Sequence, residues 1–252
     1  MKNVLKQKLK NQEKVLGAFL SINSPSLIEM IAYSGFDYVI IDDEHGAFSA
    51  SELEGLIRTA DGVGITPIVR VSYDPSSIQK ALDRGAHGIQ VPMVNTKEEA
   101  EAVVRQAKFP PLGERGVSYS IRPARYGIDK GSKYLEECNE NILVIVHIET
   151  EEAAKNFKDI ISTKGVDMAF IGSTDLSVNM GYYDDGANAL EVKSVIDNLY
   201  SIAQESDIWM GTVAANGAQA KDAFLKGSLY VCTVLNGIMA NAMRQTVLDS
   251  EV

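Results

Sequence analysis

Short apolar runs alternate with amphipathic segments along the chain from about residue 15 onward. The runs are rich in β-branched residues and are apolar at nearly every position, which is typical of parallel strands covered by helices. The pattern continues to the end of the chain without a linker rich in Pro, Gly or Ser. We expect eight strands, at residues 15–22, 38–44, 66–72, 88–94, 142–149, 168–173, 209–214 and 230–235.

The intervening segments have the spacing of amphipathic helices. Residues typical of an N-cap or a first helical turn stand at the start of four of them, at Ser24-Pro25, Ser51, Asp74-Pro75 and Thr96. Glycines typical of a helix end follow five, at Gly35, Gly64, Gly85, Gly165 and Gly227. We expect helices within residues 24–35, 49–64, 74–86, 96–109, 151–165, 189–206 and 216–228. Eight such units in 252 residues predict an α/β protein, a single TIM (β/α)8 barrel spanning 1–252, in preference to an open doubly wound sheet.

One segment, 109–141, is longer than an ordinary loop between the fourth and fifth strands. Long insertions of this kind are commonly functional. Arg115, Arg122 and Arg125 lie in it and could bind an acidic substrate tail or make subunit contacts. Three tyrosines in the same segment favour subunit contacts, because tyrosine is common at interfaces.

Composition and charge exclude several classes of protein. With 24 Lys and Arg against 34 Asp and Glu, the net charge is -10, so we expect no nucleic-acid partner and no anionic membrane partner. The basic N-terminal segment lacks the apolar region of a secretion signal, and no run reaches the roughly 18 apolar residues of a membrane span. Two distant cysteines, Cys138 and Cys232, fit neither a disulfide framework nor a metal motif, which favours the cytoplasm.

Polar residues gather where the predicted strands end. In a barrel the carboxyl ends of the strands surround the catalytic mouth, so we expect these side chains to meet at one rim. The polar residues at the strand ends are Asp42, Glu44, His45, Arg70, His147, Glu149, Ser173, Thr174 and Asp175.

Glu149 and Asp175 indicate a metal site at this rim. His147 and Glu149 are two residues apart on one strand, so both point to the side that also carries Leu143 and Ile145. A carboxylate facing the lumen is costly unless a cation or hydrogen bonds compensate it. Two carboxylates from adjacent strands suit Mg²⁺ or Mn²⁺, and Co²⁺ or Zn²⁺ is the alternative if His147 lends a nitrogen.

Three further residues complete a candidate mechanism. Arg70 supplies a fixed cation suited to a carboxylate or a developing oxyanion. His45 is a general acid or base near neutral pH, and Asp42 is placed to orient its ring. We expect Glu44 to orient a water molecule beside the metal. The set describes enolate chemistry on a 2-oxo acid.

Each residue also has a simpler explanation. The cluster at 42–46 could be a solvated strand end, and Arg70 alone is more often a salt-bridge partner. For His147, a hydrogen-bonded core histidine is at least as common as a metal ligand. The joint occurrence of the set favours function.

Several segments, in this order, carry a resemblance to a known family. They are DDEHG, PIVRV, GAHGIQVPMV with the downstream FPPLGERG, IET and FIGSTDLSVNMG. The ordered set resembles the HpcH/HpaI family of class II pyruvate aldolases, from about Leu16 to about Met243. The resemblance implies a metal-dependent lyase that cleaves 4-hydroxy-2-oxo acids to pyruvate and an aldehyde.

The resemblance also implies roles for individual residues. A divalent metal is held at Glu149 and Asp175, Arg70 lies next to the keto oxygen, and His45 with Asp42 moves protons through water. Family members assemble as hexamers, trimers of dimers that exchange the C-terminal helix. In this chain that helix is 237–250.

The chain departs from the family pattern at three positions of the site. His147 stands where the family usually has Gln, and Ser173-Thr174 where it usually has Pro-Ala. These residues adjoin the expected substrate, so the sequence does not determine the identity of the acceptor aldehyde. Three alternatives stand: an oxaloacetate decarboxylase, a citrate-lyase-like enzyme acting on a CoA ester, and a catalytically silent subunit that binds a 2-oxo acid.

Overall fold

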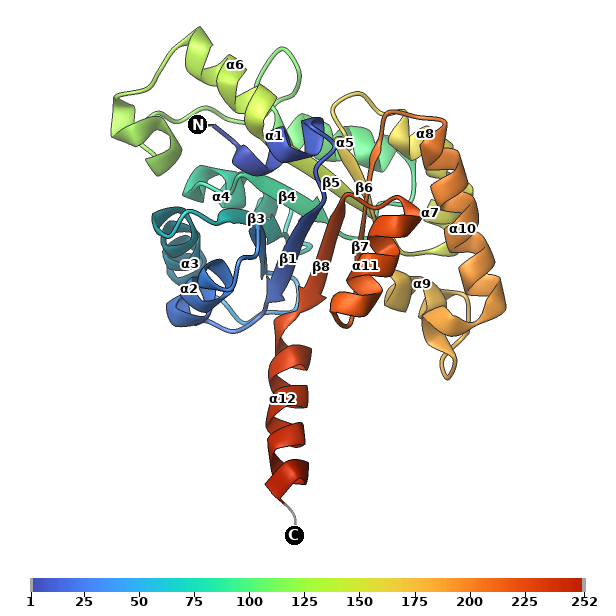
Figure 1. Cartoon of the computed structure of the whole chain (residues 1–252). Helices are drawn as coiled ribbons and strands as arrows, with labels where there is room; N and C mark the ends of the chain where they lie inside the picture. Colours follow the sequence, from blue (N-terminus) through green and yellow to red (C-terminus); the bar gives the residue numbers. More distant parts are fainter. Residues whose placement is uncertain (1, 251–252) are drawn as a thin grey trace.

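The computed structural model describes residues 2–250, so residues 1, 251 and 252 of the expected domain lie outside the described part. Eight parallel strands close into a barrel in sequence order, with β1 paired to β8 (Figure 1). The expected (β/α)8 barrel is confirmed. Its strands are β1 (Val15–Leu20), β2 (Tyr38–Asp42), β3 (Thr66–Arg70), β4 (Gly88–Val91), β5 (Leu143–Ile148), β6 (Met168–Ile171), β7 (Trp209–Val213) and β8 (Tyr230–Val234).

Every strand ends one to three residues before the end expected from the sequence. The end of β2 shows the reason. After Asp42 the chain turns, because the Gly46 N–H donates to the Asp42 carbonyl at 2.9 Å. The apolar pattern does not show where the strand ends, because the polar residues that follow it belong to the rim and not to the hydrogen-bonded strand.

Side chains of the strands alternate between two apolar cores. Ile40, Ile68, Ile145 and Phe170 belong to the cluster inside the barrel, while their strand neighbours pack outward against the helices. This alternation follows from the period of two along a strand. The lumen is therefore filled mainly with apolar side chains, and the charged residues lie at the carboxyl ends of the strands.

Helices cover the barrel largely where the sequence places them. The expected helices are α2 (Pro25–Tyr33), α3 (Ala50–Gly62), α4 (Ser77–Arg84), α5 (Lys97–Ala107), α10 (Leu190–Gln204) and α11 (Gly217–Lys226). Ser49 caps α3 with a hydrogen bond and Ser51 lies in its first turn, whereas α4 begins after Ser76 and not at Asp74. The helix expected at 151–165 is two helices, α7 (Glu151–Lys155) and α8 (Phe157–Ile161), which meet at Asn156.

The 109–141 segment contains a 3₁₀ helix, η1 (Arg122–Gly127), and a helix, α6 (Ser132–Asn141). It lies beside α1 (Val4–Lys10) at the amino-terminal end of the strands, away from the catalytic mouth (Figure 1). The expectation that this excursion carries function is not supported by this position. Its three arginines form ion pairs within the chain, Arg115 with Asp83, Arg122 with Asp61 and Arg125 with Asp129.

The last helix, α12 (Leu235–Ser250), projects from the opposite end of the barrel (Figure 1). None of its residues, all of which are described, is buried. Two shorter elements, α9 (Ser173–Asn179) and η2 (Gly186–Asn188), follow β6. Within residues 2–250, the helices lack the length and apolar character that crossing a membrane requires.

Candidate active site

Arg70 lies at the end of β3 between two carboxylates of the β2 end. Its Nε and Nη2 donate to the two oxygens of Asp42, each at 2.7 Å. Its Nη1 lies 3.0 Å from Glu44 Oε2, and the guanidinium lies over the Phe19 ring at 4.8 Å. Burial alone would lower the pKa of Arg70, but the hydrogen bond and charge of Asp42, then the charge of Glu44, raise the pKa. The side chain is therefore a fixed cation facing the rim.

Asp42 has a different partner from the one expected. Its carboxylate is occupied by Arg70, and it reaches His45 only through the His45 backbone N–H, at 3.4 Å from Oδ1. The expected contact with the His45 ring is absent from the hydrogen bonds of residues 2–250. That ring is 66% exposed, with Nε2 3.9 Å from Glu44 Oε2. Asp42 thus positions the turn that carries His45, and the ring itself is free to meet a ligand.

Glu149 follows β5 directly and is buried, with 4% of its surface exposed. The Met93 backbone N–H donates to its Oε1 at 2.7 Å, and its Oε2 lies 3.2 Å from His147 Nδ1. Burial raises the pKa of Glu149, but the hydrogen bond and charge of His147 and then the Met93 amide lower the pKa below its usual value. The carboxylate is therefore ionised at neutral pH, with lone pairs left for another partner.

His147 lies deeper in the barrel than Glu149. Its ring stacks on Phe170 with centroids 4.7 Å apart, and its Nε2 lies 3.2 Å from Gln90 Oε1. With Nδ1 on Glu149, both ring nitrogens are engaged and the residue is 1% exposed. This geometry supports the hydrogen-bonded core histidine. It does not support a metal or substrate contact through His147.

Asp175 lies in the first turn of α9, after β6, and is exposed. Ser173 and Thr174 begin the same helix, so their backbone N–H groups lack partners within it. Glu149 lies close to this turn, since a methyl group on Gly172 would stand 2.7 Å from Glu149 Oε2. The carboxylates that the sequence assigned to a metal therefore come from neighbouring strand ends.

Tyr73, which follows β3, lies close to the carboxylates of the rim. Tyr73 donates from its hydroxyl to Glu44 Oε1 at 2.9 Å. Partial burial, then the hydrogen bond to Glu44, and then the charges of Glu44, Glu149 and Asp175 raise the pKa of Tyr73 to about 12. The rim thus carries more carboxylates than cations, which would repel an anionic substrate unless a cation is added.

The donors fit a hard divalent cation. In residues 2–250, no group of three or more His, Cys, Asp or Glu side chains is arranged to hold a metal ion. Glu149 and Asp175, at neighbouring strand ends, would supply two oxygen ligands, and water or substrate the rest. Magnesium and manganese commonly bind in this way, through one or two carboxylates.

The sequence pattern predicted no role at the site for four residues of this region: Tyr73, Gln90, Met93 and Tyr230. Met93 contributes a backbone group, and its φ of 55° is a conformation that non-glycine residues seldom adopt. No sequence signal marks it. Gln90 carries a weak signal, because it is a polar residue inside an otherwise apolar strand.

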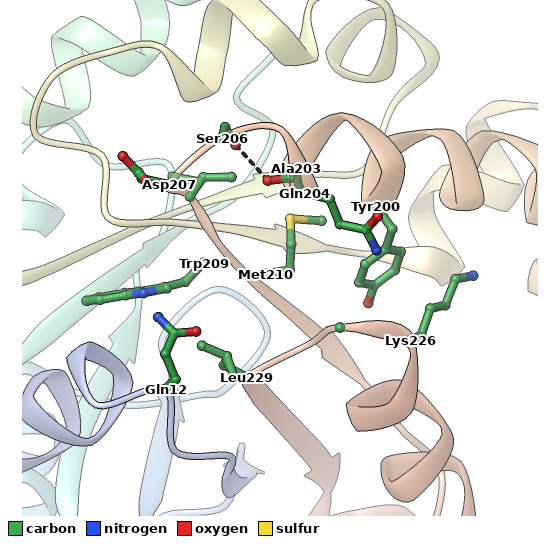
Figure 2. Close-up of a pocket in the computed structure, with 12 residues that line it drawn as sticks. Gln12, Tyr200, Ala203, Gln204, Ser206, Asp207, Trp209, Met210, Lys226 and Leu229 are labelled. Carbon is green, nitrogen blue, oxygen red and sulfur yellow. Dashed lines mark hydrogen bonds between the residues drawn. The ribbon is translucent and has the colours of Figure 1, made fainter.

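A pocket of about 320 Å³ lies elsewhere, at the amino-terminal ends of β7 and β8. Figure 2 shows Trp209, Gln12 and Leu229 around it. It contains none of the rim residues, and its position corresponds to the face of a barrel that contributes stability rather than catalysis.

Comparisons with known proteins identify the family of the chain. The chain is 35% identical to a 4-hydroxy-2-oxo-heptane-1,7-dioate aldolase of Escherichia coli over 233 residues, which cover 92% of this chain and 88% of the relative. It is 30% identical to a 2-keto-3-deoxy-L-rhamnonate aldolase of Salmonella typhi, with 92% and 86% covered. The crystal structure of a citrate synthase superposes with a TM-score of 0.87 at 30% identity, over 98% of this chain and 96% of that one. Residues 15–237 match the HpcH/HpaI aldolase/citrate lyase family, and the chain belongs to that family.

Proposed function

We propose that the protein reversibly cleaves 4-hydroxy-2-oxo acids to pyruvate and an aldehyde. Family membership and the aldolase relatives make it a carbon–carbon lyase. The observation that carries the proposal is that two carboxylates at neighbouring strand ends, Glu149 and Asp175, share one rim with an arginine that Asp42 holds in place. Such a rim can bind a 2-oxo acid and stabilise the negative charge that its enolate develops.

Glu149 and Asp175 would hold a divalent cation, with Mg²⁺ or Mn²⁺ favoured because the rim offers oxygen ligands. When bound, the cation supplies Lewis-acid stabilisation of the enolate. Co²⁺ and Zn²⁺ are less favoured, since both nitrogens of His147 are already bonded.

Arg70 would neutralise charge on the oxygen of the substrate's keto group. Its bonds to Asp42 and Glu44 leave other guanidinium N–H groups free, because arginine has five. The free amides of Ser173 and Thr174 would receive the carboxylate of the 2-oxo acid. Asp42 would act through Arg70 and the 42–46 turn, not by touching the substrate.

His45 would accept the proton of the 4-hydroxyl group through a water molecule. Its exposed ring stands on the rim, with Nε2 3.9 Å from Glu44 Oε2. In the direction of synthesis the same ring would return the proton to the new hydroxyl.

The direct test is pyruvate release from 4-hydroxy-2-oxoheptanedioate with added Mg²⁺ or Mn²⁺, measured with lactate dehydrogenase and NADH. We expect turnover with metal and none after EDTA. We expect Glu149→Gln and Asp175→Asn to reduce turnover below detection without changing the circular dichroism spectrum. Glu151→Gln is a matched control, because Glu151 is exposed and pairs only with Lys155. Full activity in Glu149→Gln would refute the site.

Exchange of the pyruvate C3 protons with D₂O separates an enzyme from a silent binding subunit. An enzyme that forms the enolate exchanges them only with metal present, as followed by proton NMR with Mg²⁺. A binding subunit never exchanges them.

The likeness to a citrate synthase supports a second candidate. Citrate formation also adds an enolate to a 2-oxo acid, so the same rim could serve a CoA ester in place of pyruvate. Citrate formed from oxaloacetate and acetyl-CoA faster than pyruvate is released from hydroxy-oxo acids would favour this candidate over the aldolase.

We also propose that copies of the chain associate through α12, as a hexamer with exchanged helices. The resemblance to the family supports this, as do the exposed apolar side chains of α12. Those more than a third exposed are Ile238, Met243, Val247 and Leu248.

A further inference from the structure

A row of polar side chains leads from the rim into the apolar interior of the barrel. We call Glu149, His147, Gln90 and Tyr230 the polar row. Glu149 Oε2 lies 3.2 Å from His147 Nδ1, and His147 Nε2 lies 3.2 Å from Gln90 Oε1. Gln90 Nε2 donates to the Tyr230 hydroxyl at 3.1 Å. The row joins three strands, β4, β5 and β8, and no member is more than 4% exposed.

Polar groups at this depth are costly unless every one is paired. A buried donor or acceptor without a partner costs about 1–3 kcal/mol, so an apolar residue at position 90 would be the simpler choice for stability alone. Gln90 is 0% exposed and lies among the apolar side chains of the lumen. Its presence is accounted for by its two partners, His147 and Tyr230.

The row has little freedom to rearrange. His147 stacks on Phe170, and Tyr230 stacks on Tyr38 with ring centroids 4.0 Å apart. The Tyr38 hydroxyl is in turn fixed by donating to the Val231 carbonyl at 2.7 Å. The rings therefore keep their planes, and the hydrogen bonds decide which atoms face each other.

The direction of both His147 bonds follows from chemistry. The carboxamide oxygen of Gln90 and the carboxylate of Glu149 can only accept, so the His147 ring donates in both bonds, from Nε2 and from Nδ1. Because Gln90 Nε2 donates to Tyr230, the amide group is held at both ends and keeps that oxygen toward His147.

We propose that Gln90 and Tyr230 are positioning residues for the carboxylate of Glu149. They hold the His147 ring so that Nδ1 faces Glu149 Oε2, while the Met93 amide holds Oε1, and the carboxylate is thereby oriented for a divalent cation. Partners of this kind, one step removed from the metal, typically alter metal affinity by about 10- to 100-fold. The inference rests on the proposed function in one respect, the assignment of Glu149 as a ligand.

The test compares Gln90→Met and Tyr230→Phe with a matched control, Tyr200→Phe. Tyr200 is also a buried tyrosine with one hydroxyl partner, Ser228 Oγ at 2.6 Å, but it lies outside the row. Two properties are measured on the full chain. The first is Mn²⁺ affinity by electron paramagnetic resonance. The second is the Nε2–H signal of His147 in ¹H–¹⁵N spectra of metal-free protein, assigned with His147→Gln.

In the wild type we expect a slowly exchanging Nε2–H signal from His147. In Gln90→Met we expect that signal to vanish and Mn²⁺ binding to weaken about 10-fold or more. Tyr230→Phe should shift the signal and weaken binding to a smaller extent, and it carries the test if Gln90→Met does not fold. Tyr200→Phe should change neither property.

Unchanged Mn²⁺ affinity and an unchanged His147 signal in the folded Gln90 or Tyr230 variants would overturn the proposal. Equal changes in Tyr200→Phe would also overturn it, since they would indicate general loosening. Wild-type pyruvate release is assayed separately. Its absence, with the Mn²⁺ and NMR responses intact, would refute the aldolase and leave the positioning role standing.

Discussion

At the scale of single residues, the site depends on charged groups that hold one another in place. Arg70 is bonded by two carboxylates, and Glu149 by a backbone amide and a histidine. Each of these bonds fixes a group whose free atoms face the rim. Preorganised charges of this kind stabilise a transition state without reorganising during the reaction.

Asp42→Asn tests the support of Arg70. An amide offers one acceptor in place of two and removes the charge, so Arg70 loses a paired hydrogen bond. We expect a loss of about 2 kcal/mol of transition-state stabilisation, or about 30-fold in kcat/KM for pyruvate release.

The control for this prediction is Asp43→Asn. Asp43 is the neighbouring carboxylate, and only its backbone N–H reaches Arg70, through the carbonyl. Similar losses in both variants would mean that the charge of the β2 end matters, and not the bond to Arg70.

The rim residues could be identified from the sequence, but their partners could not. Spacing along β5 indicates that His147 and Glu149 share a side of the strand. It cannot indicate that Gln90, 57 residues earlier, takes the second nitrogen of His147. Likewise, proximity in sequence suggested His45 as the partner of Asp42, whereas a side chain from the next strand has that role.

At the scale of elements, the joint between α5, α6 and β5 is held by a buried lysine. Lys108 donates to the carbonyls of Asn139 at 2.6 Å and Ile142 at 3.1 Å, and it is 4% exposed. Burial first, and then the positive charge of Lys6, lower the pKa of Lys108 to about 8, although Asp167 opposes this. The folded protein thus favours the neutral amine more than the unfolded chain does.

This predicts a stability that rises with pH. Between about pH 8 and the usual lysine pKa of about 10.4, the unfolded chain binds more protons than the folded one, so raising the pH favours folding. From pH 8 to 9.5 we expect the free energy of unfolding of the wild type to rise by about 1.5 kcal/mol relative to Lys108→Met. Urea unfolding at both pH values measures this, and parallel curves for the two proteins would contradict it.

The elements differ in how well the sequence predicts them. All eight strands were predicted, because their apolar runs are long and flanked by helical patterns. α9 was not predicted, since it begins two residues after β6 and its first turn consists of the polar residues Ser173, Thr174 and Asp175. The break between α7 and α8 depends on Asn156, whose side chain donates to the Asn95 carbonyl, a contact from another loop.

At the scale of the whole molecule, the two ends of the barrel carry different kinds of residues and different helices. Figure 1 shows α1 and α6 at one end and α12 projecting from the other. The end with α6 is occupied by ion pairs and buried lysines, whereas the end with α12 carries the rim. Association through α12 would bring a neighbouring subunit close to the catalytic mouth.

Removal of residues 237–252 tests the proposed association. Since α12 buries no side chain within its own chain, we expect the barrel to remain folded. Sedimentation should show a hexamer for the full chain and a smaller species for the truncated one. Leu225→Ser is the control, because Leu225 is 73% exposed on another helix. A full chain that sediments as a monomer would refute the association.

The sequence by itself determined the barrel and the set of rim residues. Strand periodicity is a local property, and in a closed parallel barrel every strand delivers its carboxyl end to the same face. Only the tertiary structure decided which side chains bond to one another and where the 109–141 segment lies. These contacts join residues far apart in the chain, such as Gln90 and Tyr230 at a separation of 140. No local pattern encodes them, because they depend on how strands and helices pack once the barrel has closed.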